Sequence, residues 1–190
     1  KLLDFCDKLI IGGGMSYTFI KAQGGDIGNS LVEESHLDLA LELLEKAREQ
    51  NVDIYLPEDS VIADDFSKDA NFKTVNSHEI EAGWMGLDIG AKAIEKYRDI
   101  IHNSKTILWN GPLGVFEFEN FSKGTMAIAE SVADATQQNA AFSLIGGGDS
   151  VSAINKSGRA DDVSFISTGG GAMLEYLEGK KLPGVQAIQD

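Results

Sequence analysis

The sequence has 190 residues, which is enough for one well-filled domain and short for two, and its 43% hydrophobic and 24% charged residues are ordinary for a globular protein. Thirty acidic residues against sixteen basic ones leave a formal net charge of -14, and such a surface repels the phosphates of nucleic acids and of anionic membranes. No apolar run approaches the roughly 18 residues that a membrane-spanning helix needs, and the single cysteine, Cys6, excludes an intrachain disulfide. We therefore expect a cytoplasmic protein that binds neither nucleic acid nor a membrane.

Short apolar segments that resemble strands alternate along the chain with helical patterns. Most of them lack polar alternation, as expected for strands that are covered on both faces. The predicted strands are Leu9–Ile11, Asp53–Leu56, Thr106–Trp109, Phe142–Ile145 and Ser164–Ile166. This order predicts an α/β fold, a three-layer α/β/α sandwich with a mainly parallel, Rossmann-like sheet, in a single domain over residues 1–190.

Three helices are predicted between these strands from apolar residues at helical spacing. The first has an apolar face of Leu37, Leu41, Leu44 and Ala47, the second of Ile94, Tyr97 and Ile101, and the third of Ala129, Val132, Ala133 and Thr136. The region from Pro57 to Trp84 is the least regular. We expect it to be a surface excursion with a short edge strand near Lys73–Val75.

Three of the predicted strands run into a glycine triplet and then into a helix. The triplets are Gly12–Gly14, Gly146–Gly148 and Gly169–Gly171. Glycine lets a ligand approach the backbone, and the following helix offers unpaired N–H groups and the positive end of its dipole to an anion. One such turn is commonly just a tight connection between a strand and a helix, but three in one domain favour a phosphate site. Neither G-x-G-x-x-G nor the P-loop pattern is present, which disfavours a dinucleotide-dependent oxidoreductase and a P-loop enzyme.

Asp149 directly follows the second triplet, and its position admits two interpretations. Asp and Ser are good helix starters, so Asp149 is a candidate N-cap. A carboxylate beside bound phosphates is also a candidate Mg²⁺ ligand, since water and phosphate oxygens fill the remaining coordination positions. The local sequence leaves both interpretations open.

The most distinctive segment follows the predicted strand that ends at Trp109 and reads WNGPLGVFEFENF. Asn110-Gly111-Pro112 predicts a turn. The apolar residues Leu113, Val115 and Phe116 lie outside a regular element and could line a planar base. Glu117 could accept hydrogen bonds from two ribose hydroxyls, although an arbitrary loop acid is more often simply solvated, as we expect of Glu119.

Six motifs together resemble the phosphoglycerate kinase family, in the order which that family uses and over essentially the whole sequence. They are KLIIGGGM, AGWMGLDIG, WNGPLGVFE, IGGGDS, STGGGA and LPGVQAI. The resemblance implies the carboxyl-terminal, nucleotide-binding domain of a kinase. That enzyme transfers a phosphoryl group between 1,3-bisphosphoglycerate and ADP, giving 3-phosphoglycerate and ATP, in glycolysis or in reverse, with Mg²⁺ as the cofactor of the nucleotide.

The resemblance also implies roles for individual residues. The adenine would lie among Gly12, Gly13, Gly86, Leu87, Pro112 and Val115. Asn110 would reach the sugar-phosphate region and Glu117 would hold the ribose. The nucleotide phosphates would lie on Gly147, Gly148, Asp149 and Ser150, with Asp149 on Mg²⁺, and the transferring phosphoryl group on Gly169 and Gly170, the candidate catalytic residues. The family often has Thr where this sequence has Ser150, and either hydroxyl can serve.

The same resemblance implies that the sequence lacks the amino-terminal domain, which holds 3-phosphoglycerate or 1,3-bisphosphoglycerate, and the first strand of this domain with its phosphate-contacting lysines. We therefore expect the isolated chain to bind ADP or ATP without turnover, and the full-length protein to be a monomer. The alternative is a non-catalytic regulatory module that binds a nucleotide or a phosphosugar with the same glycine turns.

Overall fold

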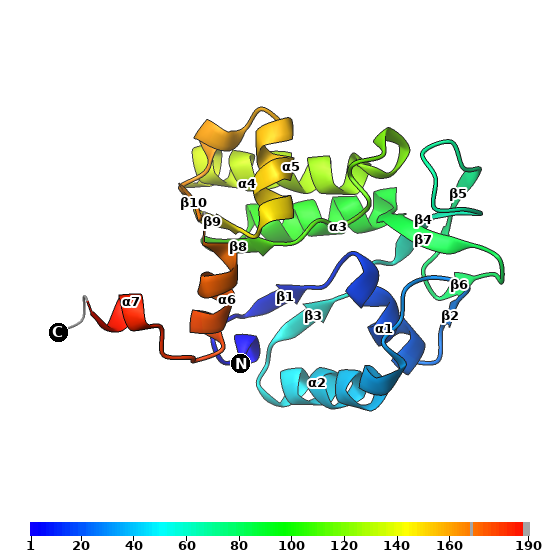
Figure 1. The fold of residues 1–190 in the computed structure, drawn as a ribbon, viewed down its shortest axis with the longest axis horizontal. Coiled ribbons are helices and arrows are strands. Elements are labelled where there is room, and N and C mark those ends of the chain that lie inside the picture. The colour runs from blue at the N-terminus through cyan, green and yellow to red at the C-terminus, as the bar shows by residue number, and fades with distance from the viewer. Residues whose placement is uncertain (168, 188–190) are drawn as a thin grey trace.

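The structure, a computed structural model, describes residues 1–167 and 169–187, and its parallel strands lie between two layers of helices (Figure 1). Thr168 and Ile188, which belong to two of the six motifs, lie outside the described residues. The elements in chain order are β1 (Lys8–Ile10), α1 (Gly14–Ala22), β2 (Asp26–Ile27), α2 (Leu37–Glu49), β3 (Asp53–Tyr55), β4 (Asp59–Ala63), β5 (Phe72–Asn76), β6 (Glu79–Ile80), β7 (Met85–Ile89), α3 (Ala91–His102), β8 (Thr106–Asn110), α4 (Lys123–Asn139), β9 (Phe142–Gly146), α5 (Gly148–Lys156), β10 (Phe165–Ile166), α6 (Gly170–Leu177) and α7 (Pro183–Gln186). Short 3₁₀ helices span Leu2–Asp4, Glu34–His36, Glu119–Phe121 and Ala160–Asp162.

The five predicted strands are confirmed as β1, β3, β8, β9 and β10, with bounds that differ from the predicted ones by about one residue at an end. All their pairings are parallel, so the α/β class is confirmed. Among the described residues they form two ladders, β1-β3 and β10-β9-β8, and no ladder pairs β1 with β8. Each of these two strands therefore has one edge without a strand partner in this part of the chain.

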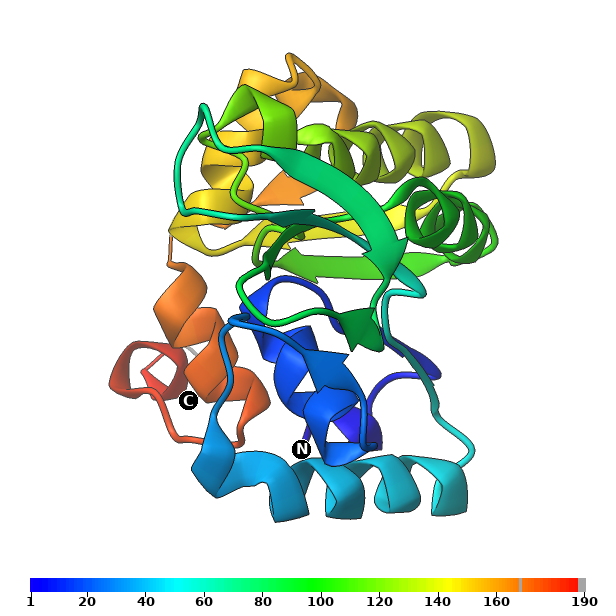
Figure 2. The same cartoon turned by 90° about the vertical axis from the view of Figure 1, so that its right-hand side faces the viewer.

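Helices connect the parallel strands and cover both faces of the strand layer. In Figures 1 and 2, α1 and α2 lie on one side of the strands and α3, α4 and α5 lie on the other. Parallel strands need such crossovers because a tight turn cannot bring the chain back to the same end of the sheet. The predicted helix-strand-helix layering is thus present.

The region between residues 57 and 89 is more regular than expected. It contains an antiparallel sheet in the order β5-β4-β7, with β5 at its edge as predicted near Lys73–Val75. The prediction of an irregular surface excursion was otherwise wrong, because β4 is the central strand and Ile62 and Ala63 are fully buried in it. A further short parallel pair joins β2 to β6.

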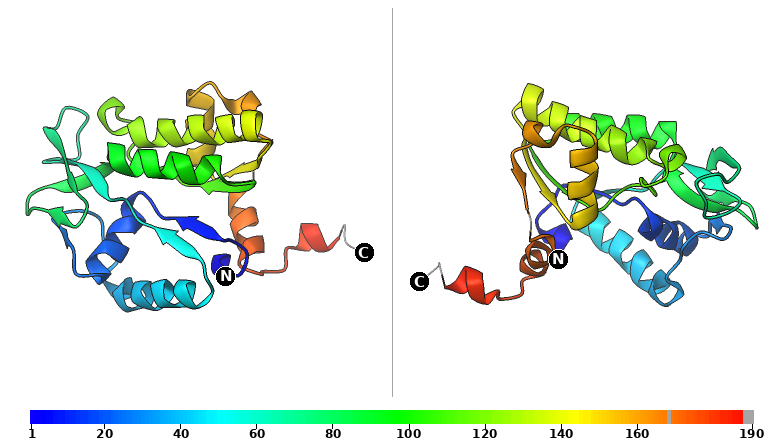
Figure 3. Two further views of the ribbon diagram at one scale, coloured as in Figure 1. Left: turned by 180° about the vertical axis from the view of Figure 1, so that it is seen from behind. Right: turned by 45° about the horizontal axis from the view of Figure 1, so that its top comes forward.

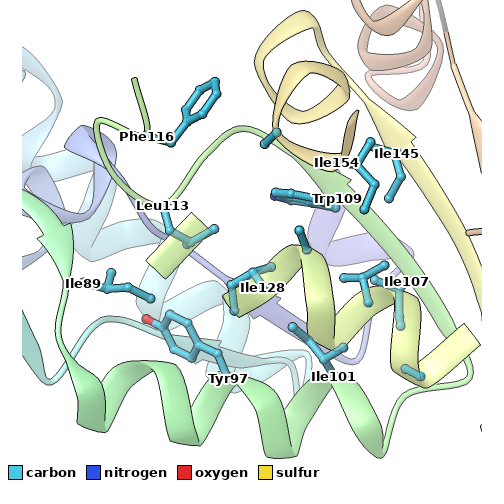
Figure 4. Packing of buried hydrophobic residues seen from close by; sticks show 14 of the residues in the cluster. Ile89, Tyr97, Ile101, Ile107, Trp109, Leu113, Phe116, Ile128, Ile145 and Ile154 are labelled. Carbon is cyan, nitrogen blue, oxygen red and sulfur yellow. The ribbon is translucent and has the colours of Figure 1, made fainter. Parts of the chain in front are cut away.

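The largest hydrophobic cluster lies between the β8-β9-β10 ladder and helices α3, α4 and α5. Figure 4 shows Trp109 from β8, Ile145 from β9 and Ile154 from α5 side by side, with Tyr97 and Ile101 of α3 at the other end. Burial of such side chains is the main stabilising contribution to a fold of this size. The ladder β8-β9-β10 is therefore anchored by one continuous core.

The predicted apolar faces of α3 and α4 are confirmed by buried Tyr97, Ile101 and Val132. The predicted face of α2 was wrong at one position, because Leu41 is 45% exposed and Ala40 is buried instead. The true face runs through Ala40, Leu43, Leu44 and Ala47. Several leucines in a row make the angular position of a helix face ambiguous from sequence.

Beyond β10 the chain leaves the strand layer. Figure 3 shows α6 below the ladder and the short α7 pointing away from the rest of the molecule. None of the helices in residues 1–167 and 169–187 combines the length and the apolar composition needed to cross a bilayer.

Candidate functional site

The glycine triplets and the 110–117 loop all follow the carboxyl ends of parallel strands. Gly12 follows β1, Asn110 ends β8, Gly146 ends β9, and the third triplet follows β10. Because these strands are parallel within their ladders, their carboxyl ends face the same way. Open α/β sheets bind ligands at this carboxyl end of their strands.

The first triplet contacts the 110–117 loop directly. The N–H of Gly13 donates to the carbonyl of Leu113 at 3.3 Å. A Cβ on Gly12 would lie 2.1 Å from Cδ1 of Leu113, and one on Gly13 would lie 3.1 Å from the carbonyl oxygen of Pro112. A side chain on Gly12 would therefore displace Leu113. This contact joins the end of β1 to the loop that follows β8.

The second triplet contacts both Asn110 and the third triplet. Gly147 has a φ of 84°, in the region that favours glycine, and a Cβ there would lie 2.7 Å from Oδ1 of Asn110. A Cβ on Gly170 would lie 2.2 Å from the backbone nitrogen of Gly147. The positive φ favours glycine at position 147, and the approach to the backbone of Gly147 requires it at position 170. The three triplets and the loop thus form one connected set of turns.

Helix α5 begins within the second triplet and carries an acidic residue in its first turn. Its N-cap is Gly147, which makes no side-chain cap, and Asp149 lies within the helix. The interpretation of Asp149 as the N-cap is therefore wrong. Asp149 is exposed, and no Cβ contact exists within 4 Å of Gly148. Among the described residues the carboxylate of Asp149 has no hydrogen-bond or ion-pair partner, and it lies beside the unpaired N–H groups at the N-terminus of α5.

Ser150, a predicted phosphate contact, is fully buried. Its Oγ accepts a hydrogen bond of 2.6 Å from the N–H of Gly111. Gly111 has a φ of 108°, and its carbonyl accepts the indole N–H of Trp109 at 2.8 Å. Ser150 therefore holds the start of the 110–117 loop against α5.

The middle of the loop is held by the first turn of α4 and by β7. Oγ1 of Thr125 accepts from the N–H groups of Leu113 and Gly114 at 3.1 and 3.2 Å. The N–H of Val115 donates to the carbonyl of Leu87 at 2.8 Å. Leu113 and Phe116, two of the three residues considered as base contacts, are buried in the large core.

Gly86 and Leu87, predicted near the adenine, lie in the middle of β7. A Cβ on Gly86 would lie 1.8 Å from Oη of Tyr17, and its N–H donates to Oγ of Ser30 at 2.9 Å. The side chain of Leu87 is buried with Ala63 and Phe121. These residues connect the loop to α1 and to the antiparallel sheet.

The remaining predicted residues lie at the margins of these turns. Glu117 is exposed at the end of the loop, as is Glu119. Gly169 is the N-cap of α6, and Gly170 is buried in its first turn. The geometry brings Gly12, Gly13, Asn110, Pro112, Gly147 and Gly170 into direct neighbourhood, whereas Leu87 reaches them only through Val115.

Two apolar residues beside the first triplet were not predicted. Leu31 is 77% exposed and its Cδ1 lies 3.1 Å from the Cβ position of Gly14, and Met15 is 67% exposed. Large apolar side chains that remain exposed beside a glycine turn are candidate ligand contacts. The sequence signal was weak, since Met15 follows the triplet directly but Leu31 lies in an irregular segment.

One buried acid lies directly behind the loop. Oδ2 of Asp88 accepts from the N–H of Gly124 at 2.8 Å and Oδ1 from that of Ile89 at 2.9 Å. A Cβ on Gly114 would lie 2.2 Å from Oδ1, so the loop covers the carboxyl group. Burial raises the pKa of Asp88 to about 7, although these two backbone donors and Lys123 oppose the rise.

The described residues contain no group of three or more His, Cys, Asp or Glu side chains that could hold a metal ion. A metal at these strand ends would have Asp149 as a single protein ligand and would need further oxygens from a bound ligand and from water.

Comparison with known proteins gives one consistent match. The family model for phosphoglycerate kinase matches residues 1–180. Phosphoglycerate kinases from Porphyromonas gingivalis and Synechococcus elongatus are each 56% identical, over 99% and 100% of this chain and 45% and 47% of their own lengths. The solved structure of phosphoglycerate kinase from Coxiella burnetii superposes with a TM-score of 0.92 at 45% identity, over 97% of this chain and 46% of that one. The chain thus spans about half the length of the relatives it matches.

Proposed function

The chain belongs to the phosphoglycerate kinase family, and on that premise we propose that it is the nucleotide-binding half of an enzyme that transfers a phosphoryl group between 1,3-bisphosphoglycerate and ADP. The products are 3-phosphoglycerate and ATP, and the reaction belongs to glycolysis. A cytoplasmic location and a monomeric full-length protein are part of the same proposal. No observation favours a non-catalytic regulatory module.

The observation that carries this proposal is the contact among the turns at the strand ends. The N–H of Gly13 donates to the carbonyl of Leu113. The side chain of Asn110 lies close to Gly147, and Gly170 lies against the backbone of Gly147. A ligand placed on these turns would touch residues that are more than 150 positions apart in sequence. An extended ligand with a base at one end and phosphates at the other fits this arrangement.

The phosphates would lie at the N-terminus of α5. There Gly147 and Gly148 offer backbone N–H groups and carry no side chains of their own, and no protein atom lies within 4 Å of the Cβ position of Gly148. The helix dipole favours the anion, which matters in a protein with a net charge of -14. In the same proposal Ser150 contributes to the phosphate site from the buried side of the first turn of α5. Gly169 and Gly170 at the start of α6 receive the transferring phosphoryl group.

Mg²⁺ would enter with the nucleotide. Asp149 is exposed in the first turn of α5, and its carboxylate makes no hydrogen bond or ion pair with the described residues. A single carboxylate is a usual protein contribution to Mg²⁺ that is bound mainly through phosphates. When bound, the ion would neutralise charge on the phosphate oxygens, and Asp149 would fix its position.

The base and the ribose would lie on the other side of Asn110. Gly12, Gly13, Gly86, Leu87, Pro112 and Val115 remain the proposed surroundings of the adenine. Exposed Leu31 and Met15 add apolar surface next to Gly14. Glu117 is free to accept from the ribose hydroxyls, because it is exposed and has no partner among the described residues.

The domain boundary is also a proposal. The edges of β1 and β8 that face away from β3 and β9 have no strand partner in the described residues. Phe142 of β9 and Phe165 of β10, in the same ladder as β8, are more than half exposed, at 53% and 58%. Unpaired strand edges and exposed apolar residues are normally covered by a further strand or by another part of the protein. We infer that a further strand of this domain, and a second domain that holds the phosphoglycerate, complete the enzyme.

The test is calorimetric titration of ADP with and without Mg²⁺. Wild type should bind ADP more tightly with Mg²⁺ than without it, and Asp149→Asn should abolish most of that difference. Asp161→Asn, an exposed acid beyond the opposite end of α5, is the matched control and should behave as wild type. Absence of ADP binding by wild type would refute the proposed function, and equal losses with and without Mg²⁺ would remove the metal role of Asp149.

Turnover tests the division of the enzyme. In-line phosphoryl transfer needs both substrates held in position and compensation of the charge on the transferring group, for which a single arginine can be worth ~10³-fold. The isolated chain should therefore show no turnover in a coupled assay, and turnover should return when the remaining half is covalently present. Robust activity of the isolated chain would contradict this division.

A further inference from the structure

The 110–117 loop has no regular structure of its own, yet hydrogen bonds from three elements fix it. Thr125 in α4 holds its middle, and Leu87 in β7 accepts from Val115. The start and the end of the loop are both held by α5. Ser150, near the N-terminus of α5, accepts from Gly111, and Lys156, the last residue of α5, donates to the end of the loop.

Lys156 makes an uncommon contact for a lysine in so acidic a protein. Its Nζ donates to the carbonyl oxygen of Phe116 at 2.9 Å and lies 5.8 Å from the centroid of the Phe116 ring. It forms no ion pair with an acid among the described residues. Phe116 is only 5% exposed, so its carbonyl has little access to water. A charged donor to a poorly hydrated carbonyl is one of the stronger hydrogen bonds in a protein.

The two contacts lie at opposite ends of one short helix. Ser150 and Lys156 are six residues apart, which is about 9 Å along a helix axis. The same helix presents Gly147 and Gly148 to the proposed phosphates. Any shift of α5 along its axis would therefore move the phosphate turn and both ends of the loop together.

We propose that Lys156 is a positioning residue for the nucleotide, which together with Ser150 makes α5 a clamp that holds the 110–117 loop at a fixed place relative to the phosphate turn. This inference rests on the proposed function, because it assumes that the base lies against this loop. Lys156 itself does not touch the ligand. It acts through the carbonyl of Phe116, which is adjacent to Glu117.

The expected effect of removing the ammonium group is a loss of nucleotide affinity without a loss of fold. Lys156→Met keeps the aliphatic stem and removes the donor, so Phe116 and Glu117 lose their fixed place. ADP affinity should fall about tenfold, because the ligand would then have to order the end of the loop when it binds. The fall should be the same with and without Mg²⁺, because the metal lies at the other end of α5. Lys156→Arg keeps a cationic donor and should stay within about threefold of wild type.

Lys105 offers a matched control. Its Nζ also donates to a main-chain carbonyl, that of Asn139, at 3.0 Å, but it lies at the opposite end of the strand layer from the glycine turns, where β8 begins. Lys105→Met should leave ADP affinity unchanged. Both Met variants should keep the melting temperature of the ligand-free full chain within about 4 °C of wild type, because each removes one side-chain hydrogen bond, which is partly buried at Lys156 and exposed at Lys105.

The experiment is titration of the four proteins with ADP, with and without Mg²⁺, together with ligand-free thermal melts. An unchanged ADP affinity in Lys156→Met, with wild-type binding intact, would overturn this inference and leave the proposed function standing. A loss that occurs only with Mg²⁺, or that Arg does not restore, would also overturn it, because Lys156 would then act on the phosphates as a charge or through packing alone. Failure of wild type to bind ADP would remove both proposals.

Discussion

The two ladders of parallel strands are built differently although they meet at one site. The β8-β9-β10 ladder rests on one large cluster that includes residues from α3, α4 and α5. The β1-β3 ladder rests on two small clusters, around Ala47 and around Phe19, that it shares with α1 and α2, and its partly buried Ile10 and Tyr55 pack against the large cluster. The second and third glycine triplets follow strands of the ladder with the large core, and the first triplet follows β1 of the other ladder. The proposed nucleotide therefore bridges a ladder with fully buried core residues and a ladder whose strand residues are partly buried or exposed.

The difference in core size predicts the largest effect. Ile145 of β9 is completely buried in the large cluster, whereas Ile54 of β3 is half-buried between the two small ones. Ile145→Ala should lower the free energy of unfolding by about 3–5 kcal/mol, and Ile54→Ala by about 1–2 kcal/mol, because the first leaves a closed cavity. Urea denaturation of both variants measures this. Equal losses would show that the two ladders are equally anchored.

The buried acid of β7, Asp88, which lies behind the loop that joins the two ladders, predicts a pH dependence. The pKa of Asp88 is raised to about 7, so between about pH 4 and pH 7 the folded protein keeps a proton that the unfolded chain releases. The free energy of unfolding should therefore fall as pH rises through this range, by about 2–4 kcal/mol from this group. Asp88→Asn, which cannot ionise, should lack this part of the slope. Identical pH profiles for the two proteins would show that Asp88 ionises normally.

The contact between the two parts can be tested with two glycines. Gly12→Ala should cost about 1–3 kcal/mol of stability, because its Cβ would press on buried Leu113. Gly148→Ala meets no protein atom within 4 Å, so it should leave stability nearly unchanged and weaken only phosphate binding. Thermal melts and ADP titrations of both variants separate the two effects. A stable Gly12→Ala protein would mean that β1 and the loop are free to move apart.

The proposed contact of Glu117 with the ribose predicts the smallest effect. Glu117→Gln should weaken ADP by about 1 kcal/mol through loss of charge-assisted hydrogen bonds, and should weaken 2′-deoxy-ADP much less. Glu119→Gln, the neighbouring exposed acid, should change neither affinity. Calorimetry with both nucleotides measures this. If ADP and 2′-deoxy-ADP weaken alike in Glu117→Gln, the carboxylate does not lie on the ribose.

Most of the parallel strands could be predicted because each is a short apolar run that ends at a glycine or a turn residue. The antiparallel sheet could not, because β4 contains Asp59 and Ser60, which look like loop residues. In the structure Asp59 is buried and accepts from the N–H groups of Lys92 and Ala93 at the start of α3. Its polarity reflects a long-range cap that local patterns do not reveal.

The site residues, too, could be predicted where a local sequence signal exists and not where their role depends on a distant partner. The glycine triplets, Asn110 and Pro112 carry local backbone signals and were predicted. Ser150 was predicted as a phosphate contact, but its hydrogen bond to Gly111 was not, and Thr125 and Lys156 were not predicted at all. These three side chains bind main-chain groups of a distant loop, and no local pattern encodes the partner of such a bond.

Amide hydrogen exchange, with and without Mg-ADP, tests most directly whether the nucleotide bridges the two parts. We expect the ligand to slow exchange on both sides, at Gly12–Gly14 after β1 and at Gly147–Ser150 after β9, and also at Gly111–Val115 between them. The edge strand β5, which belongs to neither ladder, should exchange at the same rate in both conditions. Slowed exchange confined to the turns after β9 and β10, with the first triplet unaffected, would contradict a ligand that spans both parts.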